Sequence, residues 1–458
     1  GSLTLRNGAS VEGNQAYQGG GLFNAFGRMS ISDSTLAGNS AEFGGAIASL
    51  GANGVPALAI ERSTFSGNEA VGSGGAILNR SMMNITDSTF DGNRVTTGTF
   101  AFQGGGAIDN NSFTGQADIA TSLFTNNEAR RGGAIFNFNA ADLVLRNSDV
   151  VANGLGPVFG DAGGGIWNGG SGAAVIVTDS RVNDNDGARR GGGIYSDEAG
   201  LLTLDGSEVT GNIATSDGGG VVMLAGRVVN SRIENNTSGG DGGGIYHEGL
   251  KALEIIASSI SNNAARREGG GLATFSPFAI VPDGITIDDS TVSGNTAEQG
   301  GGIANTERGV ITIRRSLIVN NAASGPFFGS GGGVFSNSSG QTTIVDSTIA
   351  GNAAASGGGG IYNSNFSLMV VDHSTVANNT SSSLGGGVVA LAPMFVTDSI
   401  IARNAGGGGS PNCADFSAIA DNGGNYTDDP GTSFPCPATF AVTPALNLGP
   451  LADNGGPT

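Results

Sequence analysis

Side chains that could carry out nucleophilic or acid–base catalysis are few in this sequence of 458 residues. Histidine occurs only twice, at His247 and His373, and these positions lie far apart in the chain. A serine–histidine–aspartate triad needs the imidazole within hydrogen-bonding reach of the serine, and the Gly-x-Ser-x-Gly motif that presents such a serine is absent from the sequence. The residues therefore predict no catalytic nucleophile, although they leave enzyme activity open.

Carboxylates are the remaining candidates for acid–base chemistry or for binding a cation. Aspartate comes directly before a recurring serine at Asp33, Asp87, Asp179, Asp289, Asp346 and Asp398. Hydrolysis of a glycosidic bond requires two carboxyl groups about 5–10 Å apart, and no two of these aspartates fall in neighbouring copies of the repeat described below. We expect solvated turn residues, and we assign no catalytic residue, no metal ligand and no cofactor. Calcium at the acidic turns is an open alternative.

Aromatic residues at one recurring position could bind a ligand by stacking. Phe136, Trp167 and Tyr195 each follow a Gly-Gly-x-Ile segment, in three successive copies of the repeat. The isoleucine is expected to face the interior, so that the aromatic ring points outward. Rings about 4.8 Å apart would form a flat strip that binds a glycan or a partner protein. The alternative is that the long loop at 154–162 folds over them.

Arginine pairs come just before glycine runs at 130–131, 189–190 and 266–267. A polysaccharide lyase would use such arginines together with calcium, and this alternative stays open. We favour exposed loops with local ion pairs, because the three arginine pairs do not fall in consecutive copies of the repeat.

A repeat of about 28 residues positions all of these side chains. Its clearest segment is Ser-x-apolar-x-x-Asn, as in Ser-Thr-Phe-Ser-Gly-Asn at 63–68, and about fifteen copies run from Asn14 to Asn404. The final asparagine is expected to sit in a turn and to bond to the neighbouring copy. The residues that carry this expectation most clearly are Asn39, Asn68, Asn93, Asn212, Asn295, Asn352 and Asn379.

Three apolar segments with an alternating pattern in each copy predict three short strands. Strands this short bury a face only if successive copies stack, so that each strand pairs with its equivalent about 4.8 Å away. Phe65 and Phe90 should then lie directly above each other in the interior. Since parallel crossovers are right-handed almost without exception, the sequence predicts an all-β, right-handed parallel β-helix of about fifteen three-strand coils over residues 1–405.

Composition excludes several classes of partner. The formal net charge is −19, which disfavours nucleic acid and anionic membrane surfaces because both require a basic face. No apolar run is long enough for a transmembrane span. The chain opens inside a repeat without a signal peptide, which favours a trimmed piece of a longer precursor.

Two sets of residues resemble known bacterial surface proteins. Gly-Gly-Ala-Ile at 44–47 and 132–135, together with Phe-x-x-Asn at 65–68 and 90–93, is similar to the repeats of chlamydial polymorphic outer-membrane proteins. The final string at 448–458 resembles the tail of right-handed β-helix surface proteins of the choice-of-anchor type, in which a cysteine pair with Gly-Asn between precedes the tail. The resemblance implies extracellular display, adhesion or surface structure.

Two cysteines fit that order, since Gly424 and Asn425 lie between Cys413 and Cys436. In an oxidising compartment a disulfide between them is expected, closing a loop that contributes about 3 kcal/mol. Residues 406–458 lack the repeat register and are predicted to form a capping segment over the last coil.

The residues, together with this resemblance, favour a non-catalytic, secreted or cell-surface bacterial protein that presents an aromatic strip and loops to a glycan or protein. The loops are insertions in the repeat, at 94–103, 154–162 and 322–330. One alternative is a polysaccharide lyase or glycoside hydrolase of the pectin-lyase-like class. Another is an extracellular filament subunit that associates end to end, because a chain that starts in mid-coil offers unpaired strand edges.

Overall fold

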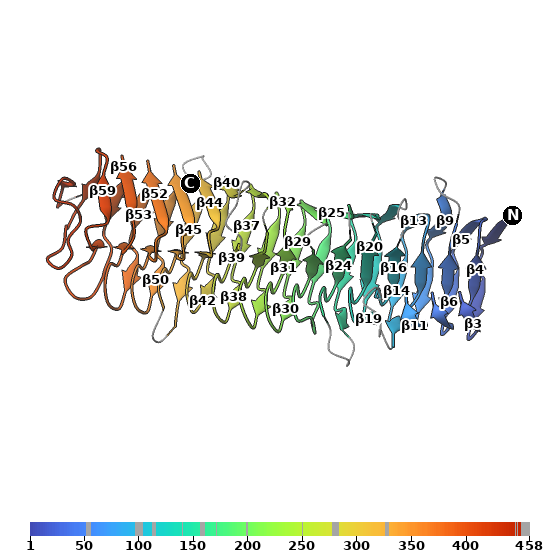
Figure 1. The fold of residues 1–458 in the computed structure, drawn as a ribbon. Helices are drawn as coiled ribbons and strands as arrows, with labels where there is room; N and C mark the ends of the chain where they lie inside the picture. The colour runs from blue at the N-terminus through green and yellow to red at the C-terminus, as the bar shows by residue number, and fades with distance from the viewer. Residues whose placement is uncertain are drawn as a thin grey trace. The chain divides into compact units, whose positions relative to one another are not determined.

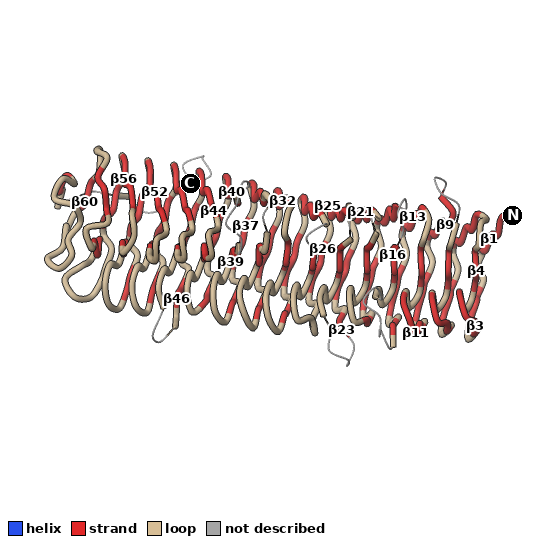
Figure 2. The backbone as a smooth tube through the Cα atoms, viewed as in Figure 1, coloured by secondary structure: helices blue, strands red, loops and turns tan. Residues whose placement is uncertain are grey.

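The computed structural model of the chain describes residues 1–51, 56–96, 104–111, 116–139, 141–155, 161–170, 172–197, 200–249, 251–276, 284–325, 329–444, 446 and 448–449. Contacts divide the chain into two compact units, residues 1–224 (unit 1) and 225–458 (unit 2), and each is described by itself. Within the described part of the chain all regular secondary structure is β-strand, and no helix occurs (Figure 2).

The coils of unit 1 share one path (Figure 1). A strand of sheet 1 leads into the turn with the recurring serine, a strand of sheet 2 follows and ends before the recurring asparagine, and a short strand of sheet 3 comes next. The glycine run then leads into a strand of sheet 4. The predicted three strands are therefore present, and sheet 3 is an addition. Most of its strands have only two residues, too few to show a period of two in the sequence.

Unit 1 contains the following strands. Sheet 1 consists of β1 (Ser2–Leu5), β5 (Arg28–Ser32), β9 (Pro56–Glu61), β13 (Met82–Thr86), β17 (Gln116–Ala120), β21 (Asp142–Arg146), β25 (Ala174–Thr178) and β28 (Leu201–Asp205). Sheet 2 consists of β2 (Ser10–Glu12), β6 (Thr35–Ala37), β10 (Thr64–Ser66), β14 (Thr89–Asp91), β18 (Leu123–Thr125), β22 (Asp149–Val151), β26 (Arg181–Asn183) and β29 (Glu208–Thr210). Sheet 3 consists of β3 (Gln15–Gln18), β7 (Ser40–Phe43), β11 (Glu69–Ser73), β15 (Arg94–Val95), β19 (Glu128–Ala129) and β23 (Gly154–Leu155), and β30 (Ile213–Ala214) takes the same place in its coil. Sheet 4 consists of β4 (Leu22–Asn24), β8 (Ile47–Ser49), β12 (Ile77–Asn79), β16 (Ile108–Asn111), β20 (Ile135–Phe138), β24 (Ile166–Gly169), β27 (Ile194–Ser196) and β31 (Val221–Met223).

Unit 2 repeats the same order of strands. Sheet 1 strands are β32 (Gly226–Val229), β36 (Leu253–Ile256), β40 (Ile285–Asp288), β44 (Val310–Arg314), β48 (Gln341–Val345), β52 (Leu368–Asp372), β56 (Met394–Thr397) and β59 (Ile419–Asp421). Sheet 2 strands are β33 (Arg232–Glu234), β37 (Ser259–Ser261), β41 (Thr291–Ser293), β45 (Leu317–Val319), β49 (Thr348–Ala350), β53 (Thr375–Ala377), β57 (Ile400–Ala402), β60 (Tyr426–Thr427) and β61 (Ala441–Val442). Sheet 3 strands are β34 (Thr237–Ser238), β38 (Ala264–Ala265), β42 (Thr296–Ala297), β46 (Ala322–Ala323), β50 (Ala353–Ala354) and β54 (Thr380–Ser381). Sheet 4 strands are β35 (Ile245–His247), β39 (Leu272–Phe275), β43 (Ile303–Thr306), β47 (Val334–Ser336), β51 (Ile361–Asn363), β55 (Val388–Ala390) and β58 (Cys413–Asp415).

Within each unit, strands pair in parallel with the equivalent strands of neighbouring coils. In β10 and β14, for example, Phe65 lies opposite Phe90. Alternate residues face the interior, since Met83 and Ile85 are fully buried while Asn84 between them is exposed. The chain is therefore a right-handed parallel β-helix, as predicted, with about 14 turns where the repeat predicted about fifteen.

Stacked phenylalanines fill part of the interior of unit 1. The ring centroids of Phe65 and Phe90 lie 4.8 Å apart, and those of Phe90 and Phe124 also lie 4.8 Å apart, with interplanar angles of 10° and 4°. All three side chains are fully buried, and each contributes about 1.5–3 kcal/mol by leaving water. The predicted vertical alignment of Phe65 and Phe90 is confirmed.

The recurring asparagines form a buried column within each unit. In unit 1, Nδ2 of Asn68 donates hydrogen bonds to Oδ1 of Asn93 at 2.9 Å and to the carbonyl oxygen of Leu36 at 2.9 Å. In unit 2, Nδ2 of Asn295 donates in the same way to Oδ1 of Asn321 at 2.9 Å. Side chain and turn backbone thus satisfy each other without water. The asparagines singled out in the sequence are all buried, namely Asn39, Asn68, Asn93 and Asn212 in unit 1 and Asn295, Asn352 and Asn379 in unit 2.

A disulfide joins Cys413 to Cys436 in unit 2. Strand β58 pairs with β55, and β60 pairs with β57, so strand pairing continues beyond residue 405. Asn412 extends the asparagine column, because its Oδ1 accepts a hydrogen bond from Nδ2 of Asn404 at 3.0 Å. That residues 406–458 act as a cap stays a prediction, and most of the string at 448–458 lies outside the described residues.

Candidate ligand-binding site

Three aromatic residues stack along sheet 4 of unit 1. Phe136, Trp167 and Tyr195 occupy equivalent positions in β20, β24 and β27. The ring centroids of Phe136 and Trp167 lie 4.5 Å apart, and those of Trp167 and Tyr195 lie 6.3 Å apart, with the rings within 16° of parallel. Ile135 and Asn137, on either side of Phe136, are fully buried, so the strand directs Phe136 to its outer face.

The stack is not the exposed strip that we predicted from the sequence. Phe136 is 0% exposed and Trp167 is 5% exposed, and only Tyr195 is half-buried. Ala162 packs against Phe136 and Trp167 in one apolar cluster, and Phe138 lies 5.7 Å from Phe136 between ring centroids. Strand alternation decides the face to which a ring points. Side chains from the adjacent turn decide whether that face stays open to water.

Arg131 covers the centre of the stack. Its guanidinium carbon lies 5.6 Å from the centroid of the Trp167 ring, within the range of a cation–π interaction. Asp161 holds the guanidinium there, because Oδ2 of Asp161 lies 3.1 Å from Nη2 of both Arg130 and Arg131. The expected local ion pairs are therefore present at this arginine pair. They keep a cation on an aromatic ring instead of leaving it fully in solvent.

The second arginine pair flanks Tyr195. The guanidinium carbon of Arg190 lies 5.7 Å from the centroid of the Tyr195 ring, and Nε of Arg190 lies 3.6 Å from Oδ2 of Asp217. Arg189 beside it is exposed, and no acidic side chain of the described residues pairs with it. The two arginines of this pair thus differ, since one is tied to an aspartate and the other faces solvent.

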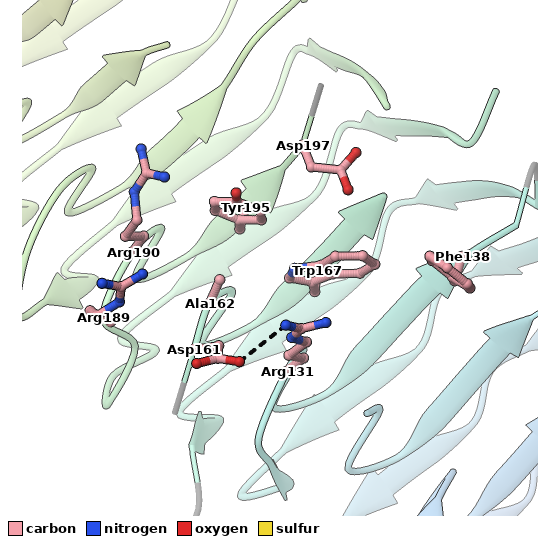
Figure 3. Close-up of a pocket in the computed structure, with 9 residues that line it drawn as sticks. All are labelled: Arg131, Phe138, Asp161, Ala162, Trp167, Arg189, Arg190, Tyr195 and Asp197. Carbon is pink, nitrogen blue, oxygen red and sulfur yellow. Dashed lines mark hydrogen bonds and ion pairs between the residues drawn. The ribbon is translucent and has the colours of Figure 1, made fainter. Parts of the chain in front are cut away.

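These side chains surround a cavity of about 380 Å³, which we call the aromatic–arginine cavity (Figure 3). It is lined by Arg131, Phe138, Asp161, Ala162, Trp167, Arg189, Arg190, Tyr195 and Asp197. Cavities that bind small ligands measure about 300–1,000 Å³. Oδ2 of Asp197 accepts a hydrogen bond from the backbone N–H of Gly170 at 3.4 Å. The cavity therefore combines an aromatic face with guanidinium donors and carboxylate acceptors.

A second buried asparagine column supports these strands, and the sequence analysis missed it. Nδ2 of Asn137 donates to Oδ1 of Asn168 at 2.9 Å, and Nδ2 of Asn168 donates to Oγ of Ser196 at 3.1 Å. These bonds hold β20, β24 and β27 in register beneath the aromatic stack. A signal for this column was present, because Gly-Gly-x-Ile-x-Asn recurs at 132–137 and 163–168.

No comparable recurring pattern in the sequence marks the carboxylates of the cavity. Asp161 comes just before a glycine run, where other copies carry arginine, and Asp197 follows β27. Asp161 meets Arg131 across 30 residues of sequence, because the turn at Arg131 forms a parallel bridge with Ala162 in the next coil. Only the stacking of consecutive turns brings these opposite charges together.

Parts of the predicted insertions lie outside the described chain, namely 97–103, 156–160 and 326–328. The described end of the 154–162 insertion does reach the stack, since Ala162 packs on Phe136 and Trp167. Ala162 therefore supports the alternative that the loop at 154–162 folds over the aromatic rings.

A buried carboxyl group occupies the position of the aromatic stack in the coil before Phe136. Asp109 in β16 pairs in register with Phe136 in β20 and is 1% exposed. Neither of its oxygens accepts a hydrogen bond of normal geometry. Burial raises the pKa of Asp109 to about 7, and the smaller opposing effects of Ser73 and Arg80 do not offset it. Asp109 is therefore neutral at mildly acidic pH.

Among the described residues of unit 2, Asp372, His373 and Asp398 bring potential metal-ligating atoms within 4.8 Å of one another. Nδ1 of His373 lies 2.8 Å from Oδ1 of Asp372, a contact that raises the pKa of His373, and Nε2 lies 3.6 Å from Oδ2 of Asp398. Calcium takes about six to eight oxygen ligands. This exposed group offers one nitrogen and two carboxylates, so it does not fit the calcium alternative.

Comparison with known proteins agrees with the architecture and the repeat. Residues 164–333 match the family model described as the right handed beta helix region. Residues 62–80 and 121–137 match the Chlamydia polymorphic membrane protein repeat. The chain is a right-handed β-helix in which two short segments are similar to the polymorphic membrane protein repeat. No curated protein and no solved structure matches it. None of the described residues forms a helix long and apolar enough to cross a membrane.

The segment at 121–137 that matches this repeat model contributes directly to the candidate site. It contains the recurring Ser122 and Asn127, and it ends at Asn137, directly after Phe136. Trp167 and Tyr195 fall within the match to the right-handed β-helix region. Of the three stacked rings, Phe136 therefore lies in the segment similar to the polymorphic membrane protein repeat, and Trp167 and Tyr195 lie outside it.

Proposed function

We propose that this chain is a non-catalytic, surface-displayed or secreted bacterial β-helix that binds a glycan in the aromatic–arginine cavity of unit 1. The observation that carries the proposal is the half-buried Tyr195 ring, which stacks on Trp167 and faces a cavity with arginine and aspartate in its walls. The matched repeat is named for a membrane protein of Chlamydia, which supports display at a surface.

A sugar ring suits this cavity because it has an apolar face and a polar edge. Its C–H face would lie against the ring of Tyr195, where an aromatic surface favours such contacts. Its hydroxyl groups would donate to Asp197 and accept from the guanidinium groups of Arg131 and Arg190. Trp167 is held between two other rings, so the platform is ordered before the ligand arrives and little entropy is lost on binding.

A glycoside hydrolase is the second candidate, because two carboxylates, Asp161 and Asp197, line the same cavity. Oδ2 of Asp161 lies 3.1 Å from Nη2 of both Arg130 and Arg131, so this oxygen is already engaged in two ion pairs. This pairing favours binding over hydrolysis. Release of reducing sugar from a bound oligosaccharide, lost in Asp197→Asn, would instead establish the enzyme.

A glycan array with matched tyrosine variants tests the proposal. Tyr195→Ala should weaken binding at least about tenfold, or about 1.4 kcal/mol, because the stacking surface is lost. Tyr362→Ala is the control: Tyr362 in unit 2 is half-buried and stacks on Phe335 with centroids 5.7 Å apart, but it does not line the cavity. Equal glycan binding by wild type and a correctly folded Tyr195→Ala protein would contradict the proposal.

A further inference from the structure

We infer that the ligand of the aromatic–arginine cavity is an acidic saccharide, bearing a carboxylate or a sulfate group, and that Arg189 pairs with its charge. The inference rests on the proposed function, since it names the class of glycan that the same cavity takes. Three observations carry it: the local balance of charge, the exposure of Arg189 without an acidic partner among the described residues, and its place at the Tyr195 end of the cavity.

The charge around the cavity is opposite in sign to that of the chain. The chain carries a formal net charge of −19. The cavity wall nevertheless holds three arginines, Arg131, Arg189 and Arg190, against two aspartates, Asp161 and Asp197. An acidic ligand is repelled by most of this protein, so a locally basic cavity is where it can bind.

The aspartates of this region neutralise every arginine but one. Asp161 lies 3.1 Å from the guanidinium groups of both Arg130 and Arg131, and Asp217 lies 3.6 Å from Arg190. Arg189 has no such acidic partner among the described residues and is exposed. A guanidinium group presents five N–H donors in a planar fork, which matches the paired oxygens of a carboxylate or a sulfate.

The backbone places Arg189 firmly at the cavity. Its carbonyl oxygen accepts a hydrogen bond from the N–H of Ser216 at 2.8 Å, and the neighbouring Ala188 forms a parallel bridge with Ala214. Figure 3 shows Arg189 and Arg190 at one end of the row formed by Tyr195, Trp167 and Phe138. A sugar ring on Tyr195 therefore directs an acidic substituent on that side toward Arg189.

Arg190 would bind an acidic group of the ligand less tightly than Arg189. Its guanidinium carbon lies 5.7 Å from the centroid of the Tyr195 ring, and Asp217 pairs with it. Binding an anion there would compete with an ion pair that already exists, whereas Arg189 gains a partner without losing one. Arg189 is accordingly the residue that separates acidic from neutral ligands.

The test compares three oligosaccharide probes by calorimetry at about 50 mM salt, where surface charges are weakly screened. Oligogalacturonate carries carboxylates, a chondroitin sulfate oligosaccharide adds sulfates, and a cello-oligosaccharide is neutral. The proteins are wild type, Arg189→Gln, and Arg28→Gln as control. Arg28 is exposed in β5, has no acidic partner among the described residues and does not line the cavity, so its loss changes the net charge equally.

We expect at least one acidic probe to bind wild type at least tenfold more tightly than the neutral probe. Arg189→Gln should remove that advantage by weakening the acidic probes at least tenfold more than the neutral probe, and Arg28→Gln should stay within twofold of wild type. The stronger of the two acidic probes identifies carboxylate or sulfate as the recognised group.

Two results would overturn the inference and differ in what they leave standing. If the neutral probe binds as tightly as the acidic ones, or if Arg189→Gln binds them as wild type does, acidic specificity fails and glycan binding remains. If none of the three probes, nor any glycan of an array, binds wild type, the proposed function fails together with the inference. Circular dichroism shows that the variants are folded.

Discussion

The guanidinium group of Arg131 lies over the face of Trp167, 5.6 Å from the ring centroid, and its Nη2 lies 3.1 Å from Oδ2 of Asp161. Trp167 is the only tryptophan in the sequence and is 5% exposed. Its fluorescence therefore reports on this one contact, without interference from another indole. The same signal also serves as a probe for any ligand that enters the cavity.

Replacing Arg131 with alanine should expose Trp167 to water. We expect a red shift of the emission and stronger quenching by acrylamide, together with a loss of about 0.5–1 kcal/mol of stability from the cation–π contact. Arg130→Ala is the matched control, because Arg130 also pairs with Asp161 but is not the arginine over the ring. Equal quenching in the two variants would show that Arg131 does not shield the indole.

Replacing Asn295 with leucine should destabilise unit 2 by about 3 kcal/mol. Oδ1 of Asn295 accepts from the backbone N–H of Asn263 at 2.9 Å, and its Nδ2 donates to the carbonyl oxygen of Ile260 at 2.9 Å. Each buried group left without a partner costs about 1–3 kcal/mol. Denaturant unfolding measures the change, with the exposed neighbour replaced in Thr296→Ala as control. Unfolding midpoints that coincide for wild type and Asn295→Leu would exclude a structural role for the column.

Asp109 should make unit 1 less stable as the pH rises. Burial raises its pKa from 3.8 to about 7, so the folded state holds the proton more tightly than the unfolded state. The favourable contribution is fully present below about pH 4 and is lost as the pH approaches and passes about 7, by about 4 kcal/mol at most.

Asp109→Asn removes this dependence because an amide does not titrate. Its stability relative to wild type should therefore increase from pH 5 to pH 8, as measured by urea unfolding at both values. Asp118→Asn serves as control, since Asp118 is partly exposed and paired with Arg146. A constant difference between Asp109→Asn and wild type across this pH range would contradict the assignment.

Removing the disulfide should destabilise the C-terminal part of unit 2. Cys413 and Cys436 are 23 residues apart, and a loop of that size contributes about 3 kcal/mol by restricting the unfolded chain. We propose that the segment at 406–458 caps the last coil, so a double Cys413→Ser, Cys436→Ser variant should melt earlier than wild type. Reductant should lower the melting temperature of wild type to that of the variant and leave the variant unchanged. A wild-type melt that does not respond to reductant, with the bond shown to be open, would argue against the cap.

The repeat made the architecture readable from the sequence. Phe65 and Phe90 are buried and stacked because a period of two along each strand and a period of about 28 along the chain together specify both face and height. The stacking of Asn68 on Asn93 follows from the same periods, since turn residues at the same position of successive repeats must lie above one another. These properties depend on recurrence, which a single sequence displays.

The environment of the aromatic stack was decided by tertiary structure. Alternation correctly placed Phe136 and Trp167 on the outer face of sheet 4, yet both are buried. Ala162 packs against both rings, and Arg131, paired with an aspartate 30 residues further along the chain, covers Trp167. Such a contact occurs once and has no period, because it depends on how two adjacent turns fold against each other. Recurrence in the sequence therefore determined the fold, and non-recurring contacts between stacked turns decided the shape and charge of the cavity.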